Sequence, residues 1–443
     1  MVRENAGKKQ PGRNTMKFGR RTTTFMLTAA LALGTTALSG LSSQLAAQER
    51  TLKVWFGRDQ FIPEDQFAQF KAENPDIAVE FEVIRLEDVS AQLVLATRSG
   101  NAPDIVQIQA RDITQLAQGG MLKEFDAQIE TFKEQFPDTY NQLSPIAWEG
   151  ASSADGKLYG VALFVQSIYL TYRKDLLEAA GIAMPLETTD NVLAAAKAVS
   201  TIPGGGDMLG FSLIGCCVAP TWELPLFLAM GGQFIDGVPQ IDTEVGIEWI
   251  EFYQTLMRDK SASPDSASWD SGQMRAAFVG GRAGVMHEGE HIYVEIEKTM
   301  PYAEGKWTFE RLPTRPGQTE PHVQSGFAFP FVVTTAADDD DAVVRALEYL
   351  ARPDFAKQVA IRYQPTTNSA VSNDPEYLAA KPWAQDIAPL AASLVSLPTH
   401  PTRVIQIYDV LTQLRDRSVA DTTTPAADLA KEYQDLVNKA AGL

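Results

Sequence analysis

The residues whose types and spacing could support chemistry are His287, Glu288 and His291, which match the His-Glu-x-x-His pattern of zinc proteases. On a helix, histidines four positions apart share one face and bind a single zinc ion, with the glutamate as general base. Here residues 283–286 predict a strand that ends at His287, and Gly289 predicts a turn. The two histidines therefore do not share a helical face. A zinc peptidase stays the weaker interpretation, and we expect no metal or other cofactor.

Other catalytic patterns receive less support from the residues. His322 and His400 lie at no recognisable spacing for a third zinc ligand. The chain has no Gly-x-Ser-x-Gly nucleophile motif, and its only cysteines are the adjacent Cys216 and Cys217, which makes a Cys-His nucleophile improbable. An exported carbohydrate-active hydrolase remains an alternative because acids are plentiful, although nothing places two carboxylates at a catalytic separation. Recovery of a ligand unchanged after incubation would separate binding from hydrolysis.

The two cysteines allow two interpretations. In an oxidising compartment Cys216 and Cys217 could form a vicinal disulfide, although its small ring is strained. Two buried free thiols that pack as small hydrophobes are the alternative. A mass measurement with and without reductant distinguishes the two.

Aromatic residues beside acids and amides give a more productive signal. Such groups follow two of the predicted strands, and further tryptophans lie later in the chain: Trp55, Phe56, Arg58, Asp59, Gln60, Gln107, Gln109, Arg111, Asp112, Trp222 and Trp383. Hydroxyls of a sugar or polyol need hydrogen-bond donors and acceptors, while its C–H faces rest on aromatic rings. In an open α/β sheet, ligands bind beyond the carboxyl ends of the strands. The cluster therefore predicts a site for a neutral polyhydroxylated ligand.

The elements that must position these residues alternate between strand and helix. Residues 52–56 and 77–83 predict strands, a helix opens at Pro63 between them, and a second helix ends at Gly100 before a strand at 105–108. This β-α-β pattern recurs after Tyr159 and predicts mostly parallel sheets covered by helices. The acidic run 338–341 predicts a charged helix start rather than a metal cluster, because apolar residues follow it at helical spacing.

The N-terminal segment predicts where the protein is located, and the net charge excludes some partners. Arg20-Arg21, an apolar run over 25–41 and small residues at 46–47 form an export signal, so we expect residues 1–47 to be a leader that is removed, with twin-arginine export favoured over the general route. The leader holds seven basic residues and one acidic residue, which leaves 31 basic and 55 acidic residues, a net charge of -24, in the remainder. That charge argues against nucleic acid or an anionic membrane as the partner.

The mature chain resembles the extracellular solute-binding proteins of ABC transporters, specifically the maltose-binding-like family 1. Several segments carry the resemblance in order: 52–55 (LKVW), 102–106 (APDIV), 116–122 (LAQGGML), 156–161 (GKLYGV), 172–177 (YRKDLL), 230–232 (MGG), 277–286 (AFVGGRAGVM) and 364–367 (QPTT). Each segment alone is weak, but their order spans nearly the whole mature chain.

The resemblance implies an α/β, two-lobed periplasmic-binding-protein fold of type II. Each lobe would be a mostly parallel sheet flanked by helices, and crossing hinge strands would join the lobes around a ligand cleft. It places the N-terminal lobe at 48–164 plus 313–360 and the C-terminal lobe at 165–312 plus 361–443. The first crossing is expected near Phe164-Val165 and the return near Leu312-Pro313.

The resemblance also implies which positions bind the ligand. They are Arg58, Asp59, Gln60, Gln109, Arg111, Asp112, Gln166, Trp222, Glu290, His291, Gly326, Phe327 and Arg403. Gln166 stands where the family has an acidic residue, and His291 stands where it often has tryptophan. Tyr408 is the nearest aromatic to a ring that the family places near Arg403.

These differences predict a ligand that is smaller and more polar than a long maltodextrin. We expect a sugar, polyol or small polar glycoside, delivered by a periplasmic, monomeric protein to an inner-membrane ABC permease. Arg58 and Arg111 could pair with an anionic group, so a peptide, a polyamine or a phosphorylated ligand stays open.

Overall fold

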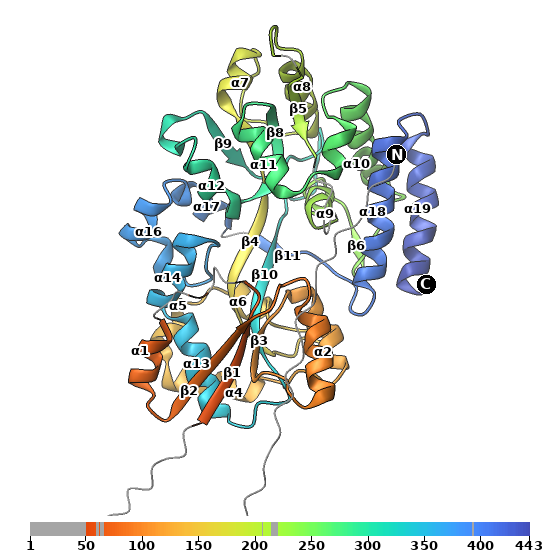
Figure 1. Cartoon of the computed structure of the whole chain (residues 1–443). Coiled ribbons are helices and arrows are strands. Elements are labelled where there is room, and N and C mark those ends of the chain that lie inside the picture. Colours follow the sequence, from red (N-terminus) through yellow and green to blue (C-terminus); the bar gives the residue numbers. More distant parts are fainter. Residues whose placement is uncertain (1–49, 59–61, 63–65, 206, 214–219, 392–393) are drawn as a thin grey trace, which may run out of the picture. The chain divides into compact units, whose positions relative to one another are not determined.

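The first three strands form a parallel sheet. The computed structural model describes residues 50–58, 62, 66–205, 207–213, 220–391 and 394–443 (Figure 1). The strand β1 (Arg50–Phe56) pairs in parallel with β2 (Ile77–Val83) and with β3 (Ile105–Gln107). These strands confirm the β-α-β expectation for the start of the mature chain.

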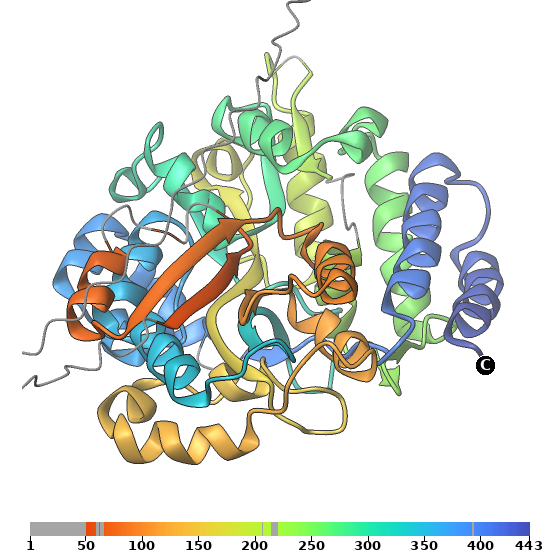
Figure 2. The ribbon, with the colours of Figure 1, turned by 60° about the horizontal axis from the view of Figure 1, so that its bottom comes forward.

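Helices cover both faces of this parallel sheet. The helix α1 (Gln66–Glu73) follows β1, and α2 (Val89–Ser99) follows β2. Because β1 lies between β2 and β3, the chain crosses the sheet in opposite directions, and right-handed crossovers then put α1 and α2 on opposite faces (Figure 2). The left-handed backbone of Gly100, with a φ of 71°, ends α2 as predicted. The expected helix start at Pro63 lies outside the described residues.

Two long strands join the two halves of the fold. All 14 residues of β4 (Gly160–Arg173) are buried. Its first part pairs antiparallel with β10 (Gln324–Val333), and its second part pairs antiparallel with β8 (Ala283–Gly289). The strand β10 also pairs with β3, so β4 and β10 cross from one half to the other (Figure 1).

Shorter strands complete the sheet beyond β4. The remaining strands are β5 (Leu209–Ser212), which is parallel to β8, β9 (Trp307–Glu310), which is antiparallel to β4, and β11 (Leu394–Ser396), which is parallel to β10. A separate hairpin joins β6 (Phe234–Ile235) to β7 (Val238–Pro239). The sheet is therefore mixed rather than mostly parallel, because the crossing strands run against their neighbours.

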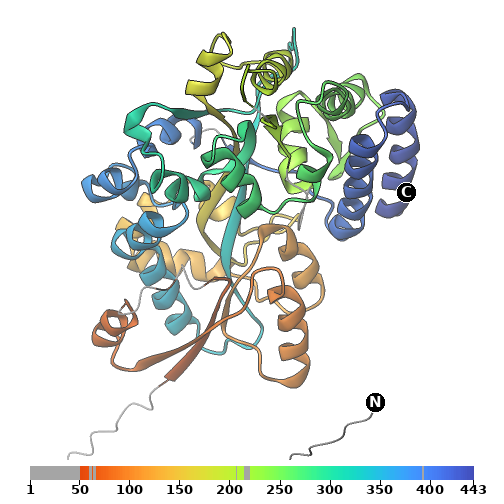
Figure 3. The same cartoon turned by 45° about the horizontal axis from the view of Figure 1, so that its top comes forward.

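The remaining helices divide between the two halves. Those that pack with the first half are α3 (Ile113–Gln118), α4 (Asp126–Gln135), α5 (Pro137–Gln142), α6 (Ile146–Glu149), α13 (Asp340–Ala351) and α14 (Pro353–Arg362). The others are α7 (Lys174–Ala179), α8 (Thr189–Ser200), α9 (Pro220–Ala229), α10 (Glu244–Arg258), α11 (Ser271–Val279), α12 (Tyr293–Glu297), α15 (Ser369–Ser372), α16 (Pro375–Ala380), α17 (Ala384–Ala391), α18 (Val404–Ala420) and α19 (Ala426–Ala441). Figures 1 and 3 show α18 and α19 side by side next to α10.

Short 3-10 helices connect several of these elements. They are η2 (Ala110–Asp112), η3 (Pro264–Ser268), η4 (Glu290–Ile292) and η5 (Tyr302–Glu304). Two of them matter for the site, because η2 follows β3 and η4 follows β8 directly in sequence.

Each half has its own hydrophobic core. One cluster of buried residues draws on 52–164 and 328–359, and another draws on 168–312 and 397–441. A third cluster, rich in aromatic rings, includes Tyr293, Trp307 and Trp383. Trp383 is 2 % exposed, so it packs in this core and does not line a ligand site. Two cores on either side of β4 and β10 leave the crossing strands as the shared element.

Side-chain caps begin several helices, including the one that the sequence predicts after the acidic run 338–341. The Thr188 hydroxyl accepts a hydrogen bond from the backbone N–H of Asn191. The Asn191 side chain in turn accepts from the backbone N–H of Thr188, which makes a capping box. The Asp339 carboxylate accepts from the backbone N–H of Ala342 at 3.0 Å, so the acidic run 338–341 is a helix start.

Candidate functional site

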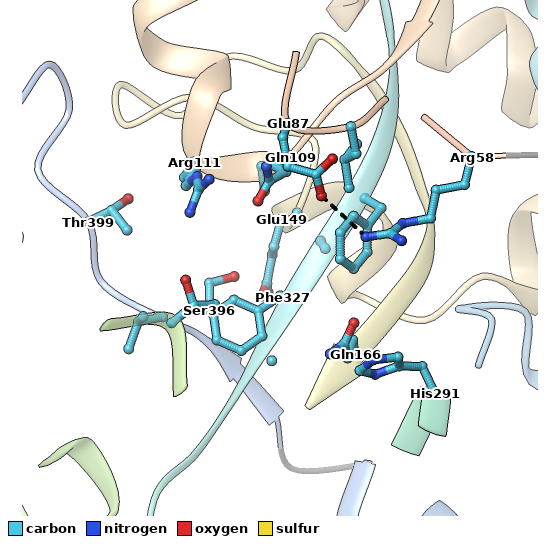
Figure 4. Close-up of a pocket in the computed structure, with 18 of the residues that line it drawn as sticks. Arg58, Glu87, Gln109, Arg111, Glu149, Gln166, His291, Phe327, Ser396 and Thr399 are labelled. Atoms are coloured by element: carbon cyan, nitrogen blue, oxygen red, sulfur yellow. Dashed lines mark hydrogen bonds and ion pairs between the residues drawn. The ribbon is translucent and has the colours of Figure 1, made fainter. Parts of the chain in front are cut away.

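A cavity of about 680 Å³ lies at the crossing strands and takes residues from both halves. Gln166 of β4 and Phe327 of β10 line its centre. Figure 4 shows Arg58, Gln166 and His291 on one side of it and Arg111, Ser396 and Thr399 on the other. We call these the β4 side, with Arg58, Gln166, His291 and Tyr363, and the α18 side, with Arg111, Ser396, Thr399 and Tyr408.

The structure brings together many of the positions expected from sequence. Seven of them line the cavity: Arg58, Gln109, Arg111, Gln166, His291, Gly326 and Phe327. Asp112, Glu290 and Arg403 do not line it; Asp112 and Glu290 lie behind lining residues, and Arg403 precedes α18. Asp59, Gln60, Cys216 and Cys217 lie outside the described residues, as does the side chain of Trp222, whose backbone belongs to α9.

Sequence reasoning missed several lining residues. They include Glu87, Glu149, Arg275, Arg362, Tyr363, Ser396 and Thr399. Arg362 and Tyr363 directly precede Gln364-Pro365, a segment that carried the family resemblance. Their position beside this motif could have identified them as lining residues. Arg275 on α11 and Glu149 on α6 carry no local pattern, and only the packing of their helices brings them to the cavity.

The turn after β1 positions Arg58. The Gly57 backbone N–H donates to the side-chain Oε1 of the buried Gln107 on β3 at 2.9 Å, which ties this turn to the sheet. The Arg58 guanidinium lies 3.5 Å from a Glu87 carboxylate oxygen and 5.6 Å from the centre of the Tyr363 ring. Its side chain keeps 39 % of its surface exposed, so both contacts are weak and a ligand can compete for the guanidinium.

The 3-10 helix η2 positions Arg111 on the α18 side. Its guanidinium lies 5.8 Å from the centre of the Tyr408 ring, and its Nε lies 3.8 Å from an Asp112 carboxylate oxygen. The Asp112 carboxylate also accepts from the Ser90 hydroxyl at 2.7 Å. Burial raises the pKa of Asp112, and the charge of Arg111 opposes that shift. Asp112 is therefore a support for Arg111 and not a direct ligand contact.

Gln166 is held in one orientation by a second buried amide. The side-chain Nε2 of Gln364 donates to Oε1 of Gln166 at 2.7 Å, and Gln364 is 1 % exposed. Because Oε1 of Gln166 already accepts this hydrogen bond, the Nε2 group is the part of the amide that remains available, as a donor. A Cβ atom at position 289 would collide with Gln166 Nε2 and with His291 Nδ1, so glycine is needed where these two nitrogens converge.

His291 stays uncharged at physiological pH. Burial lowers the pKa of His291 to about 3, and the positive charges of Arg58, Arg275 and Lys381 lower it further. Its Nδ1 is buried and makes no hydrogen bond among the described residues. A neutral imidazole carries one N–H donor and one acceptor, so His291 can donate to a ligand or accept from it.

Glu290 lies behind this wall and supports the crossing strand. Its carboxylate accepts from the backbone N–H of Ser167 at 3.1 Å. Burial raises the pKa of Glu290 to about 8, and burial lowers the pKa of Lys381 to about 7, while the charge of each partner opposes the other's shift. Lys381 donates to the Tyr363 carbonyl at 2.9 Å. This pair links η4, β4 and the loop after α14.

A buried polar network joins the two crossing strands. The Gln324 side chain donates from Nε2 to the Ser167 hydroxyl at 2.9 Å and to the Ile168 carbonyl, and its Oε1 accepts from the Leu312 backbone N–H at 3.1 Å. The Ser167 hydroxyl donates to the Ser325 carbonyl at 2.8 Å. All of these groups are buried, so the network fixes how β4 and β10 pass each other.

The geometry of the His-Glu-x-x-His segment does not suit zinc. His287 belongs to β8 and His291 to η4, as the sequence predicted, so they do not share a helical face. The His287 ring lies 5.0 Å from the Phe211 ring and stacks on Phe252 at 6.2 Å, in the core of the second half. Among the described residues, no group of three or more His, Cys, Asp or Glu side chains could hold a metal ion.

The comparison that decides the family is a match over residues 57–357 to the model of the bacterial extracellular solute-binding proteins. The chain belongs to this family. Membership makes it an exported or periplasmic binding protein, and it confirms the resemblance that the sequence motifs carried. No helix within the described ranges is long and apolar enough to cross a membrane.

Individual relatives are more distant. A putative binding protein of Brucella abortus is 27 % identical over 280 residues, which are 62 % of this chain and 65 % of that protein. The match therefore spans just under two thirds of the relative's length.

Solved structures show the same fold. Maltose-bound MalE3 of T. maritima matches with a TM-score of 0.73 and 20 % identity over 88 % of this chain and 99 % of that one. A solute-binding protein of Agrobacterium radiobacter K84 in complex with ribitol matches with a TM-score of 0.73 and 17 % identity over 89 % and 99 %. The fold is thus that of two-lobed, maltose-binding-like proteins.

Proposed function

We propose that this protein captures a sugar or polyol in the cavity between its two halves and delivers it to an ABC permease in the inner membrane. One observation carries the proposal: the cavity lies on the two crossing strands and receives side chains from both halves. A ligand that contacts both halves stabilises a closed arrangement over an open one, which is how a two-lobed receptor reports that it is loaded.

The chemistry of the lining supports this ligand class. Phe327 and Tyr408 offer apolar faces for C–H groups, and Ser153, Ser396 and Thr399 offer hydroxyls. The cavity volume of about 680 Å³ lies in the range typical of small-molecule sites. The arabinooligosaccharide-binding protein of Halalkalibacterium halodurans, 25 % identical over 48 % of this chain and 46 % of that protein, is one relative named for a carbohydrate.

The remaining parts of the proposal concern the whole chain. We assign 48–164 plus 313–360 to the N-terminal lobe and 165–312 plus 361–443 to the C-terminal lobe, with residues 1–47 as a leader for twin-arginine export. The protein acts as a periplasmic monomer without catalysis. If Cys216 and Cys217 form a vicinal disulfide, it would present a flat apolar plate near Trp222.

A ligand screen tests the proposal. Purified mature protein is heated with a panel of pentoses, hexoses, alditols, disaccharides and maltotriose, since a ligand that binds only the folded form raises the melting temperature. We expect at least one compound of this class to raise it, to show saturable binding by calorimetry and to be recovered unchanged. Tight binding of maltotriose would contradict the small-ligand expectation, and cleavage of the ligand would favour the hydrolase. If no carbohydrate or polyol binds while a short peptide does, the proposal is overturned.

A further inference from the structure

The charge of the cavity differs from the charge of the chain. Residues 48–443 carry 31 basic and 55 acidic residues. Among the described residues, the cavity lining holds four arginines, Arg58, Arg111, Arg275 and Arg362, against the three glutamates Glu87, Glu149 and Glu295. The described lining thus has one more arginine than glutamate, although residues 48–443 as a whole are strongly acidic.

The carboxylates of the lining do not neutralise all of these arginines. Glu295 pairs with Lys298 at 2.7 Å on its own helix, and Glu87 pairs with Arg58 at 3.5 Å. Within the part of the chain that the structure describes, Arg275 forms no ion pair, and Arg362 donates only to the Gln358 carbonyl at 3.4 Å. Within the described residues, Arg275 and Arg362 therefore bring positive charge to the cavity without an ion-pair partner.

The β4 side concentrates donors as well as charge. Gln364 engages the acceptor of Gln166, so the Gln166 amide offers its Nε2 donor. The positive charges of Arg58, Arg275 and Lys381 all lower the pKa of the neutral His291. No carboxylate is among the groups that shift this pKa. The buried acids behind this wall are engaged: Glu290 accepts from Ser167 N–H, and Glu288 accepts from Gly289 N–H at 2.8 Å. A ligand group at this side meets donors and cations.

We propose that the ligand is a polyhydroxylated anion, a sugar or polyol that carries one carboxylate or phosphate group, and that Arg58, Arg275 and Gln166 hold this group on the β4 side. The inference rests on the proposed function and specifies its substrate class. Guanidinium groups bind carboxylate and phosphate oxygens through charge-assisted hydrogen bonds. The rest of the ligand lies toward Phe327 and the hydroxyls of the α18 side.

Matched ligands test this assignment. Calorimetry compares each neutral compound with its acid and its phosphate: D-glucitol, D-gluconate and D-glucitol 6-phosphate, then D-galactose, D-galacturonate and D-galactose 6-phosphate. We expect at least one anion to bind about tenfold or more tightly than its neutral partner, because a hydrogen bond to a charged group contributes about 1.5–3 kcal/mol. The acid and phosphate arms distinguish the two sources of charge.

Two variants connect the effect to the assigned residues. Arg58→Gln and Arg275→Gln are each expected to reduce the affinity for the anion at least about tenfold more than the affinity for its neutral partner, so the preference for the anion is lost. Arg98→Gln, at the exposed end of α2, is the control and is expected to leave both affinities unchanged. Higher salt should weaken the binding of the anion and leave the binding of the neutral compound unchanged.

Three outcomes separate this inference from the proposed function. If neutral compounds bind and no anion exceeds its partner, the inference is overturned and the proposed function stands. If the arginine variants weaken neutral and anionic ligands equally, the assignment of the anion to this side is overturned. If neither these two series nor the wider carbohydrate panel binds, both proposals are overturned.

Discussion

Arg58 and Arg111 lie on two sides of the same cavity, and the structure holds them in different surroundings. On the β4 side, Gln166, Gln364 and Glu290 are buried and hydrogen-bonded at the crossing strands, whereas Arg58 itself remains partly exposed. On the α18 side, Arg111 rests on a single ring, Tyr408, with Asp112 behind it. The β4 side is thus fixed by a buried network, and the α18 side depends on one stacked pair.

This difference shows how a two-lobed receptor can combine specificity with movement. Buried and hydrogen-bonded groups such as Gln166 and Glu290 cost much to displace, so this part of the β4 side keeps one geometry. Among the described residues, Arg111 is held by a cation–π contact and an ion pair rather than by hydrogen bonds, and these contacts cost less to rearrange, so the α18 side can adjust when a ligand enters. The following substitutions test that contrast, from the largest expected effect to the smallest.

Removing the side chain that joins the crossing strands should have the largest effect. Gln324→Leu leaves the Leu312 N–H, the Ile168 carbonyl and the Ser167 hydroxyl without their buried partner. Each orphaned group costs roughly 1–3 kcal/mol, so we expect the free energy of unfolding to fall by about 3 kcal/mol or more in urea titrations. Gln318→Leu, at a partly exposed amide, is the control and should cost less. Equal losses would contradict a special role for the network.

Crowding the β4 side should weaken binding without unfolding the protein. In Gly289→Ala, the new methyl collides with Gln166 Nε2 and His291 Nδ1, and these side chains, which both line the cavity, must shift. We expect ligand affinity, measured by calorimetry, to fall about tenfold to a hundredfold, which corresponds to roughly 1.4–2.7 kcal/mol. Gly119→Ala at the end of α3, where the new methyl meets the end of the flexible Met121 side chain away from the cavity lining, is the control and should retain affinity. Retained affinity in Gly289→Ala would mean that this wall adjusts as readily as the α18 side.

The β4 side should also respond to acid. The pKa of His291 is about 3 in the folded protein, mainly because of burial, against an ordinary value of 6.5. The stabilisation from keeping His291 neutral is therefore present above pH 6.5 and is lost as the pH falls toward 3. Relative to His291→Gln, the wild-type free energy of unfolding should decrease by about 1.4 kcal/mol per pH unit over this window. Parallel curves for the two proteins would show that His291 is not held neutral.

The smallest effect should come from the α18 side. Arg111→Lys keeps the positive charge but loses the planar contact with Tyr408. Lysine keeps part of the cation–π attraction, so the substitution should cost about 0.5–1 kcal/mol, and ligand affinity should fall by no more than about fivefold in calorimetry. Arg98→Lys on α2 provides the matched control. A loss as large as that of Gly289→Ala would remove the distinction between the two sides.

The sequence predicted much of the fold because its local signals were strong. Alternating apolar residues predicted β1 and β2, Gly100 predicted the end of α2, and Asp339 predicted the start of α13. Turn and cap residues act within a few positions, so they can be recognised without knowledge of the tertiary structure. The mixed sheet was not predicted, because strand direction depends on which distant strands pair.

The candidate site was predicted only where its residues follow a strand or lie in a recognisable motif. Arg58, Gln109 and Arg111 come just after β1 and β3, and Gln166 and Phe327 lie on the crossing strands. Arg275 and Glu149 reach the cavity from α11 and from α6, where no local pattern marks them. Glu290 was expected from the family resemblance to bind the ligand. The structure places it behind the lining, where its carboxylate accepts from the Ser167 N–H.

By itself, the sequence determined the family, the acidic surface and the local elements, because composition, motif order and short-range periodicity are properties of the chain. Only the tertiary structure decided which side chains share the cavity and which charge they present there. The arginines of the lining lie far apart in the sequence and come together through the packing of two cores on two shared strands. A chain of strongly negative net charge can therefore present a cluster of positive side chains at one place.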